Sequence, residues 1–248
     1  MYGLKSDTLP CVVRSAAFAL LQLVVTPPWA IVSMLTFPLP LRSRYAVVST
    51  WSRFMVWSAK RILGIRYRVV GMENVPPEPC VIVAKHESAW ETLAFQKIFP
   101  PQVWVVKREL LWIPFFGWGL AMLSPIAIDR KAGPRALKQM IEQGRERLAR
   151  GFFIVVFPEG TRSAPGKRGV YRSGGAWLAL ETGAAILPVA HNAGTYWPRN
   201  AFVKQPGTIT VSIGRIVRAE GHNAAALMQN IEQWIENETQ RIRERETP

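Results

Sequence analysis

The chain has 248 residues, which is enough for one sizeable hydrophobic core and an appendage. Its formal net charge of +14 favours a polyanionic partner, either nucleic acid or an anionic membrane surface. Ten tryptophans favour the membrane, because amphipathic rings prefer the headgroup region. The two cysteines, Cys11 and Cys80, exclude a disulfide framework, and neither they nor the three histidines have the spacing of a zinc site.

The N-terminal residues 1–71 are predicted to form membrane-anchoring helices. Residues 15–41 contain no charged side chain and are long enough for one transmembrane helix. Pro27 and Pro28 would break or kink such a helix, so a bent or re-entrant hairpin is the alternative. Residues 42–65 have the pattern of a basic, tryptophan-bearing interfacial helix, or of a core-packing helix with a solvated basic edge. The positive-inside rule places this basic segment on the cytoplasmic face.

Residues 72–248 are predicted to form one α/β domain. Short apolar runs alternate with helical patterns, which is typical of a mixed sheet flanked by helices. The predicted strands are 67–70, just before the domain boundary, and 80–84, 103–107, 125–128, 152–157, 186–190 and 208–213. The predicted helices are 88–98, 134–149, 174–182 and 224–245.

His86 is expected at the carboxyl end of the strand 80–84, which is the edge where open α/β sheets bind ligands. In the motif KHESAWE, Glu91 follows His86 by five positions. On a continuous helix these side chains would point about 140° apart, but they can meet if His86 lies in the turn before a helix that carries Glu91. The carboxylate would fix the tautomer and leave the other ring nitrogen as a base. For this pair taken alone, a structural histidine is the alternative.

A covalent enzyme intermediate is not expected. The sequence has no GxSxG motif and no other serine or cysteine nucleophile motif. The simplest chemistry is therefore general-base activation of a substrate hydroxyl.

The motif FPEGTRS, residues 157–163, follows the predicted strand 152–157. Gly160 permits a tight turn and a close approach of backbone to a ligand. Thr161 and Arg162 can donate to phosphate oxygens, and arginine can do so in a bidentate manner. Taken alone, the motif favours a polar turn with a solvated basic run. Together the two motifs indicate a base and an anion clamp at the same end of one sheet.

Four blocks of the chain resemble the glycerolipid acyltransferases. KHESAWE is similar to the NHxSxxD block of that family, and FPEGTRS is identical to its third block. IDR at 128–130 and ILPVA at 186–190 are similar to its second and fourth blocks. The blocks occur in the family's order, and the basic hydrophobic N-terminus is similar to that of the bacterial 1-acylglycerol-3-phosphate acyltransferase group.

The resemblance implies a reaction and a set of site residues. The reaction is transfer of a fatty acyl group from an acyl thioester, on coenzyme A or acyl carrier protein, to the sn-2 hydroxyl of lysophosphatidate, giving phosphatidate. His86 is then the general base and Glu91 orients it. The residues expected to bind the acceptor phosphate are Arg130, Glu159, Gly160, Thr161 and Arg162, to which we add Lys107 at the end of a neighbouring predicted strand. No metal or other cofactor is expected. The bilayer of the inner membrane is the expected partner, with the catalytic domain on its cytoplasmic face.

Two residues depart from the family pattern. Position 91 is usually Asp, and Glu is one methylene longer but still a carboxylate. Lys85 stands where Asn is common and adds positive potential beside the base. Ser88 is expected to be either a helix cap or a ligand contact. His191 and His222 are expected to have non-catalytic roles.

Other functions stay open on the sequence alone. The same blocks would serve an acyltransferase that acts on glycerol 3-phosphate or on another lyso-lipid. A non-catalytic lipid-binding relative would keep the blocks without turnover. A nucleic-acid-binding protein would account for the charge but not for the uncharged N-terminal stretch, so nucleic acid is not an expected partner.

Overall fold

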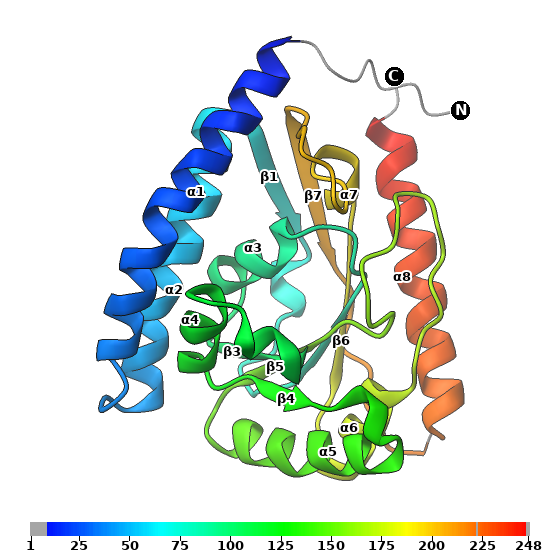
Figure 1. The fold of residues 1–248 in the computed structure, drawn as a ribbon. Coiled ribbons are helices and arrows are strands. Elements are labelled where there is room, and N and C mark those ends of the chain that lie inside the picture. Colours follow the sequence, from blue (N-terminus) through cyan, green and yellow to red (C-terminus); the bar gives the residue numbers. More distant parts are fainter. Residues whose placement is uncertain (1–8, 222, 247–248) are drawn as a thin grey trace.

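A computed structural model describes residues 9–221 and 223–246, and its centre is a seven-stranded sheet in the order β1-β7-β6-β2-β5-β3-β4 (Figure 1). The strands are β1 Ile65–Val70, β2 Val81–Ala84, β3 Gln102–Lys107, β4 Ile126–Ile128, β5 Phe153–Val156, β6 Ile186–His191 and β7 Gly207–Ile213. Neighbouring strands are parallel except for β6 and β7. The mixed sheet predicted from the sequence is thus confirmed, and each predicted strand is present.

The two strands that precede the chemical motifs are neighbours at the centre of the sheet. β2 pairs with β5 in parallel, with Val81 opposite Ile154. Every residue of both strands is buried, as expected for uninterrupted apolar runs that are covered on both faces. Burying each large aliphatic side chain of such a strand contributes about 1.5–3 kcal/mol relative to leaving it in water. The core therefore fixes the two strand ends from which the motifs emerge.

Helices cover both flanks of the sheet (Figure 1). They are α1 Leu9–Leu35, α2 Leu41–Ser58, α3 Trp90–Ile98, α4 Phe116–Met122, α5 Pro134–Ala149, α6 Gly174–Thr182, α7 Ala193–Tyr196 and α8 Ala224–Glu246. The first four pack against one another on one flank, whereas α8 packs on β6 on the opposite flank. α5 and α6 lie side by side at one end of the molecule. The four helices predicted for the domain are present.

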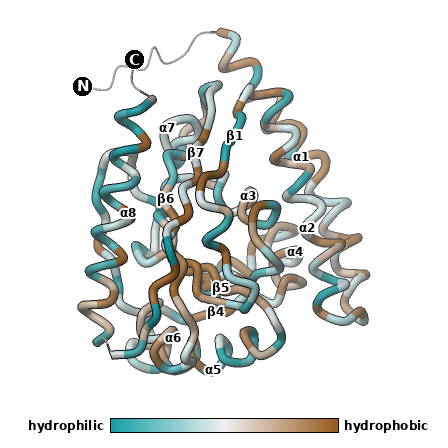
Figure 2. Tube along the Cα trace, turned by 180° about the vertical axis from the view of Figure 1, so that it is seen from behind, coloured by the Kyte–Doolittle hydropathy of each residue, from teal (hydrophilic) through white to brown (hydrophobic). Residues whose placement is uncertain are grey.

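α1 is one helix that continues through Pro27 and Pro28, so the predicted break at these prolines is not observed. Proline removes an N–H donor, but its fixed φ is compatible with helical backbone, and α1 as a whole packs on α4. The chain reverses between residues 35 and 41, and α2 returns alongside α1 (Figure 2). The N-terminal half of α1 contacts the domain, because Ser15 Oγ accepts the N–H of Lys204 at 2.9 Å.

The outward side of α1 is apolar and exposed to solvent. Figure 2 shows hydrophobic segments along this helix, and Leu20, Leu23 and Val24 are each more than half exposed. By length and composition α1 is capable of crossing a membrane. α2 packs one of its sides into the core through Tyr45 and Met55. This agrees with the core-packing alternative for residues 42–65.

The sheet begins before the predicted domain boundary. β1 lies within residues 1–71, yet it pairs along its whole length with β7, from Ile65 opposite Gly207 to Val70 opposite Ser212. The sheet therefore starts at Ile65, before the predicted boundary between the anchoring segment and the domain. The assignment of residues 1–71 to membrane anchoring stays a prediction.

Candidate active site

His86 and Glu91 meet just beyond the end of β2. β2 ends at Ala84, residues 85–88 form an extended connection, and Glu91 lies in the first turn of α3. Nδ1 of His86 is 2.8 Å from Oε1 of Glu91. The Glu91 carboxylate is completely buried, whereas 16% of the His86 side chain is exposed. The geometry is the one expected for a histidine in the turn before a carboxylate-bearing helix.

The same oxygen of Glu91 also holds the backbone of the connection. Oε1 accepts the N–H of Glu87 at 3.0 Å and the N–H of Ser88 at 2.8 Å. Burial alone would raise the pKa of Glu91, but His191, His86 and the Ser88 N–H outweigh it and lower this pKa below the ordinary range. Glu91 is therefore a charged anchor for both the imidazole ring and the loop that carries it.

One face of the His86 ring stacks on Phe157, the first residue of FPEGTRS. The two rings are stacked with centroids 4.1 Å apart and an interplanar angle of 13°. Within residues 9–221 and 223–246, no hydrogen bond involves Nε2 of His86. The His86 side chain is partly exposed, so Nε2 is the ring nitrogen left without a partner among the described residues, at a partly open site.

The FPEGTRS turn packs directly against the His86 backbone. It follows β5, and Gly160 adopts a left-handed conformation with φ 68° that closes the turn onto the Phe157 carbonyl. The N–H of Ser163 donates to the His86 carbonyl at 2.7 Å. The N–H of His86 donates to Oε1 of Glu159 at 2.8 Å. The two motifs, predicted to lie at the same sheet edge, are therefore joined by hydrogen bonds.

Glu159 is buried, and its observed contact is with the backbone N–H of His86. Thr161 is exposed and Arg162 is partly exposed, so both can reach a bound anion. The carbonyl of Arg162 accepts Nη1 of Arg199 at 2.6 Å. Arg199 lies in the turn after α7 and brings a further cation to this motif, which no pattern in the sequence had indicated.

Lys107 and Arg130 follow the outer strands β3 and β4. Lys107 is the last residue of β3, and its ammonium pairs with Glu109 at 3.2 Å on the surface. Arg130 begins a short 3-10 helix after β4, but its side chain lies outside the part of the chain that the structure describes. His222 also lies outside the described residues. The substrate-binding roles of Lys107 and Arg130 stay predictions.

Ser88 and His191 support the loop from within. Ser88 Oγ accepts the N–H of Trp90, the first residue of α3, at 3.0 Å, while the N-cap position itself is Ala89. His191 is completely buried. Its Nδ1 accepts the N–H of Ala193 at 3.2 Å, which assigns the ring proton to Nε2, 2.8 Å from the Lys85 carbonyl. His191 thus holds backbone on both sides of its ring.

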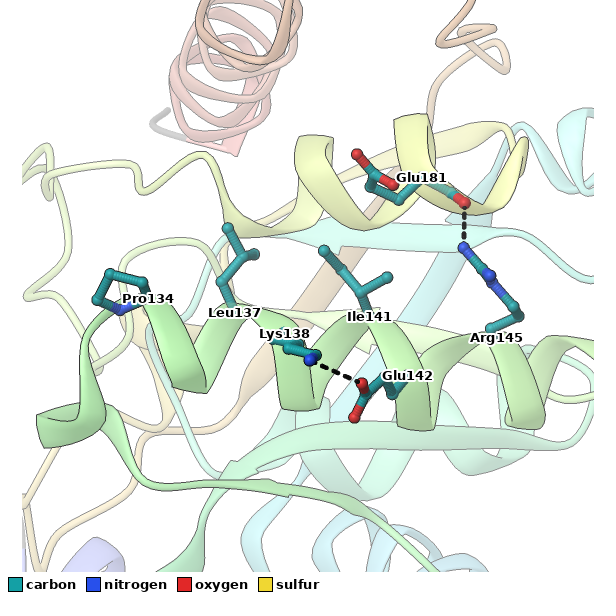
Figure 3. A pocket seen from close by; sticks show the side chains of 7 residues that line it. All are labelled: Pro134, Leu137, Lys138, Ile141, Glu142, Arg145 and Glu181. Carbon is teal, nitrogen blue, oxygen red and sulfur yellow. Dashed lines mark hydrogen bonds and ion pairs between the residues drawn. The ribbon is translucent and has the colours of Figure 1, made fainter.

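A groove of about 520 Å³ lies between α5 and α6 (Figure 3). Its walls carry surface interactions, including the Lys138–Glu142 ion pair and a hydrogen bond from Arg145 to the Glu181 carbonyl. None of the predicted site residues lines this groove. We therefore locate the chemistry at the His86 and FPEGTRS strand ends.

Comparison with known proteins decides the family. The model of the family described as "Acyltransferase" matches residues 66–192, a range that contains both motifs. The chain belongs to this acyltransferase family. Its resemblance to the glycerolipid acyltransferases, drawn from the sequence motifs, is confirmed.

Two curated relatives carry the same name. The chain is 47% identical over 228 residues to the 1-acyl-sn-glycerol-3-phosphate acyltransferase of Pseudomonas aeruginosa, covering 90% of this chain and 89% of the relative. It is 31% identical over 173 residues to 1-acyl-sn-glycerol-3-phosphate acyltransferase alpha of Mus musculus, covering 68% of this chain and 61% of the mouse protein.

A solved structure has the same fold. It is the crystal structure of the 1-acyl-sn-glycerophosphate (LPA) acyltransferase from Thermotoga maritima, with a TM-score of 0.74 and 21% sequence identity. The match covers 95% of each chain, so it includes the N-terminal helices and α8 as well as the sheet.

Proposed function

We propose that this acyltransferase moves a fatty acyl group from an acyl thioester to the sn-2 hydroxyl of lysophosphatidate and releases phosphatidate. Relatives of the same name from a bacterium and a mammal support this acceptor. The observation that carries the proposal is the His86–Glu91 hydrogen bond, which leaves Nε2 available beside the FPEGTRS turn.

The proposed chemistry is general-base catalysis at His86. Nε2 takes the proton of the sn-2 hydroxyl as its oxygen forms a bond to the thioester carbonyl carbon. The carbon–sulfur bond then breaks, and the leaving thiolate receives the proton from the imidazolium. The buried Glu91 carboxylate keeps Nδ1 protonated and stabilises the transient imidazolium. The acyl carrier, coenzyme A or acyl carrier protein, is a co-substrate, and no metal or other cofactor takes part in these steps.

The acceptor phosphate is proposed to bind at the turn beside the base. Thr161 and Arg162 supply donors from FPEGTRS, and the positive φ of Gly160 brings the turn backbone close to the ligand. Arg130 and Lys107 are proposed to add charge from the neighbouring strand ends. In this proposal Glu159 acts indirectly, by holding the N–H of His86.

The membrane is proposed to cover the exposed apolar side of α1. Next to α1, the segment 110–118 exposes large apolar side chains, with Trp112 exposed over 79% of its surface. The other exposed members of this segment are Leu110, Ile113, Phe115, Phe116 and Trp118. Aromatic side chains at a surface favour the headgroup region. We place this face on the inner membrane with the active site on the cytoplasmic side, where lysophosphatidate is reached from the bilayer.

Acyl transfer by detergent-purified protein tests the proposal. Labelled oleoyl-coenzyme A and oleoyl-acyl carrier protein are offered in turn with lysophosphatidate or glycerol 3-phosphate. We expect labelled phosphatidate from lysophosphatidate, and loss of turnover in His86→Ala. The matched control is Arg241→Met, which removes an exposed arginine that pairs only with its own helix neighbour Glu238 among the described contacts.

Each other result has a defined meaning. Turnover of glycerol 3-phosphate in place of lysophosphatidate would move the protein to the alternative acceptor class. Binding of lysophosphatidate without transfer from either carrier would contradict the catalytic role and support a lipid-binding one.

A further inference from the structure

Two buried charges flank the base and are not used by the proposed chemistry. Lys85 and Glu87, the residues before and after His86, are both completely buried. Burying an ion is costly unless a partner of opposite charge compensates for it. Both partners come from α8, which lies more than 140 residues further along the chain.

Glu87 is held between α8 and α7. Its Oε1 accepts Nη2 of Arg243 in a short ion pair, and its Oε2 accepts the N–H of Gly194 at 3.3 Å. The Glu87 side chain is completely buried, and the Arg243 side chain is 16% exposed. Both oxygens of the residue after the base are thus fixed by protein groups.

Lys85 forms an ion pair with Glu236, which lies seven residues before Arg243 on α8. Its ammonium lies 2.5 Å from Oε1 of Glu236 and donates to the Lys167 carbonyl at 3.2 Å. The hydroxyl of Tyr171 donates to the same Glu236 oxygen at 2.9 Å. Glu236 therefore joins the residue before the base to the loop that follows FPEGTRS, which Figure 1 draws in yellow-green beside α8.

The two tethers lie on one face of α8. Glu236 and Arg243 are seven residues apart, which is about two helical turns, so their side chains project in the same direction. Thr239, which lies between them on this face, is buried as well. α8 lies beyond residues 66–192, the range that the family model matches.

We propose that Glu236 and Arg243 are positioning residues for acyl transfer, acting through Lys85 and Glu87 to hold His86 in register with the FPEGTRS turn. This inference rests on the proposed function. The two ion pairs fix the chain on both sides of the base, so their loss lets the His86 ring shift relative to the bound acceptor. A displacement of about 1 Å at a reacting group lowers the rate about 10²-fold.

A paired substitution separates positioning from simple stability. Arg243→Met leaves the Glu87 carboxylate buried without its cation, so it lowers both the melting temperature and kcat. Adding Glu87→Gln removes that charge while keeping an oxygen for the Gly194 N–H. We expect the double variant to regain most of the melting temperature but to keep a kcat at least about tenfold below wild type, with KM for lysophosphatidate within about twofold.

The opposite results would overturn the inference. Recovery of kcat together with the melting temperature would mean that the pair serves stability alone. A raised KM with an unchanged kcat would mean that Arg243 serves acceptor binding. If the double variant does not fold, Lys85→Met with Glu236→Gln applies the same test to the other tether, since Gln still accepts the Tyr171 hydroxyl.

Wild type and Arg241→Met complete the experiment. Arg241 is two positions from Arg243, is exposed, and pairs within α8. Turnover by both proteins shows that the proposed reaction holds, so a slow double variant then reports on positioning. Absence of turnover in wild type would instead contradict the proposed function itself.

Discussion

Glu91 binds Nδ1 of His86 with the same carboxylate oxygen that accepts the backbone N–H groups of Glu87 and Ser88. One buried side chain thus sets both the orientation of the ring and the path of the loop. The longer glutamate, in place of the aspartate usual at this block, reaches all three donors from the first turn of α3.

Replacing Glu91 by Gln is expected to lower kcat about 10²- to 10³-fold, because an amide cannot stabilise the imidazolium and presents a donor as well as an acceptor. Glu91→Asp keeps the charge with a shorter reach and is expected to lose less. Steady-state kinetics with lysophosphatidate and oleoyl-coenzyme A measure both. Equal rates in Gln and wild type would show that this carboxylate does not support the base.

The ionised Glu91 also makes stability depend on pH. Burial opposes ionisation, but His191, His86 and the Ser88 N–H lower the Glu91 pKa below its ordinary value. Such a group stabilises the folded state above the unfolded pKa of about 4.3, and this contribution is lost as pH falls through the folded value. The difference in free energy of unfolding between wild type and Glu91→Gln should therefore shrink as pH falls below about 4. Urea unfolding followed by circular dichroism measures it, and a difference that stays constant at low pH would contradict the assignment.

Gly194 has no room for a side chain. A Cβ at this position would lie 2.8 Å from the Cβ of Glu87 and 3.1 Å from Cγ of Pro165. Gly194→Ala is expected to destabilise the protein by about 1–3 kcal/mol through overpacking and to lower kcat by displacing Glu87. Gly119→Ala in α4 is the control, because a Cβ there meets no atom within 4 Å and alanine favours a helix. Equal melting temperatures for Gly194→Ala and Gly119→Ala in thermal unfolding would contradict this packing argument.

The thiol of Cys80 is expected to be unreactive in the folded protein. It is buried just before β2, and burial raises the pKa of its thiol to about 12. A thiol reagent at pH 8 should modify Cys80 only after denaturation, because the thiolate is the reactive form. Cys80→Ala should retain kcat, since the proposed chemistry has no covalent enzyme intermediate. Trapping of an acyl group on Cys80 by mass spectrometry would refute that mechanism.

The outer side of α1 is expected to determine membrane binding. Replacing Leu20, Leu23 and Val24 by Ser removes three of its exposed apolar side chains and should release the protein from vesicles of phosphatidylglycerol and phosphatidylethanolamine in a flotation assay. A triple Ser control replaces the exposed apolar residues Val70, Met72 and Ile216 on the domain. If both variants float like wild type, α1 is not the main contact.

The sequence was sufficient to predict the strands and the place where the motifs meet. Uninterrupted apolar runs marked β2 and β5, and the polar residues after each run lie together because the strands are parallel neighbours. His86 lies before a helix that carries Glu91, which is the condition under which the sequence allowed the two side chains to meet. These features depend on local patterns, which a single sequence displays.

The tertiary contacts of the site were not predictable in the same way. Glu236 and Arg243 look like ordinary charges on an amphipathic helix, and only the fold brings them to Lys85 and Glu87. Glu159 was predicted to bind substrate, whereas its contact in the fold is the His86 N–H, and its role in binding stays a prediction. α1 continues through two prolines and packs on α4, and no local pattern in the sequence reports either feature.

The pairing of β1 with β7 orders events during synthesis of the chain. β1 leaves the ribosome early, but its partner strand follows only after residue 206, and α8 is made last. α1 is therefore available to a membrane long before the sheet can close or the helix behind His86 can dock. In the proposed membrane-bound form, α1 can reach the bilayer while the sheet edge is still open and before the catalytic loop gains its contacts with α8.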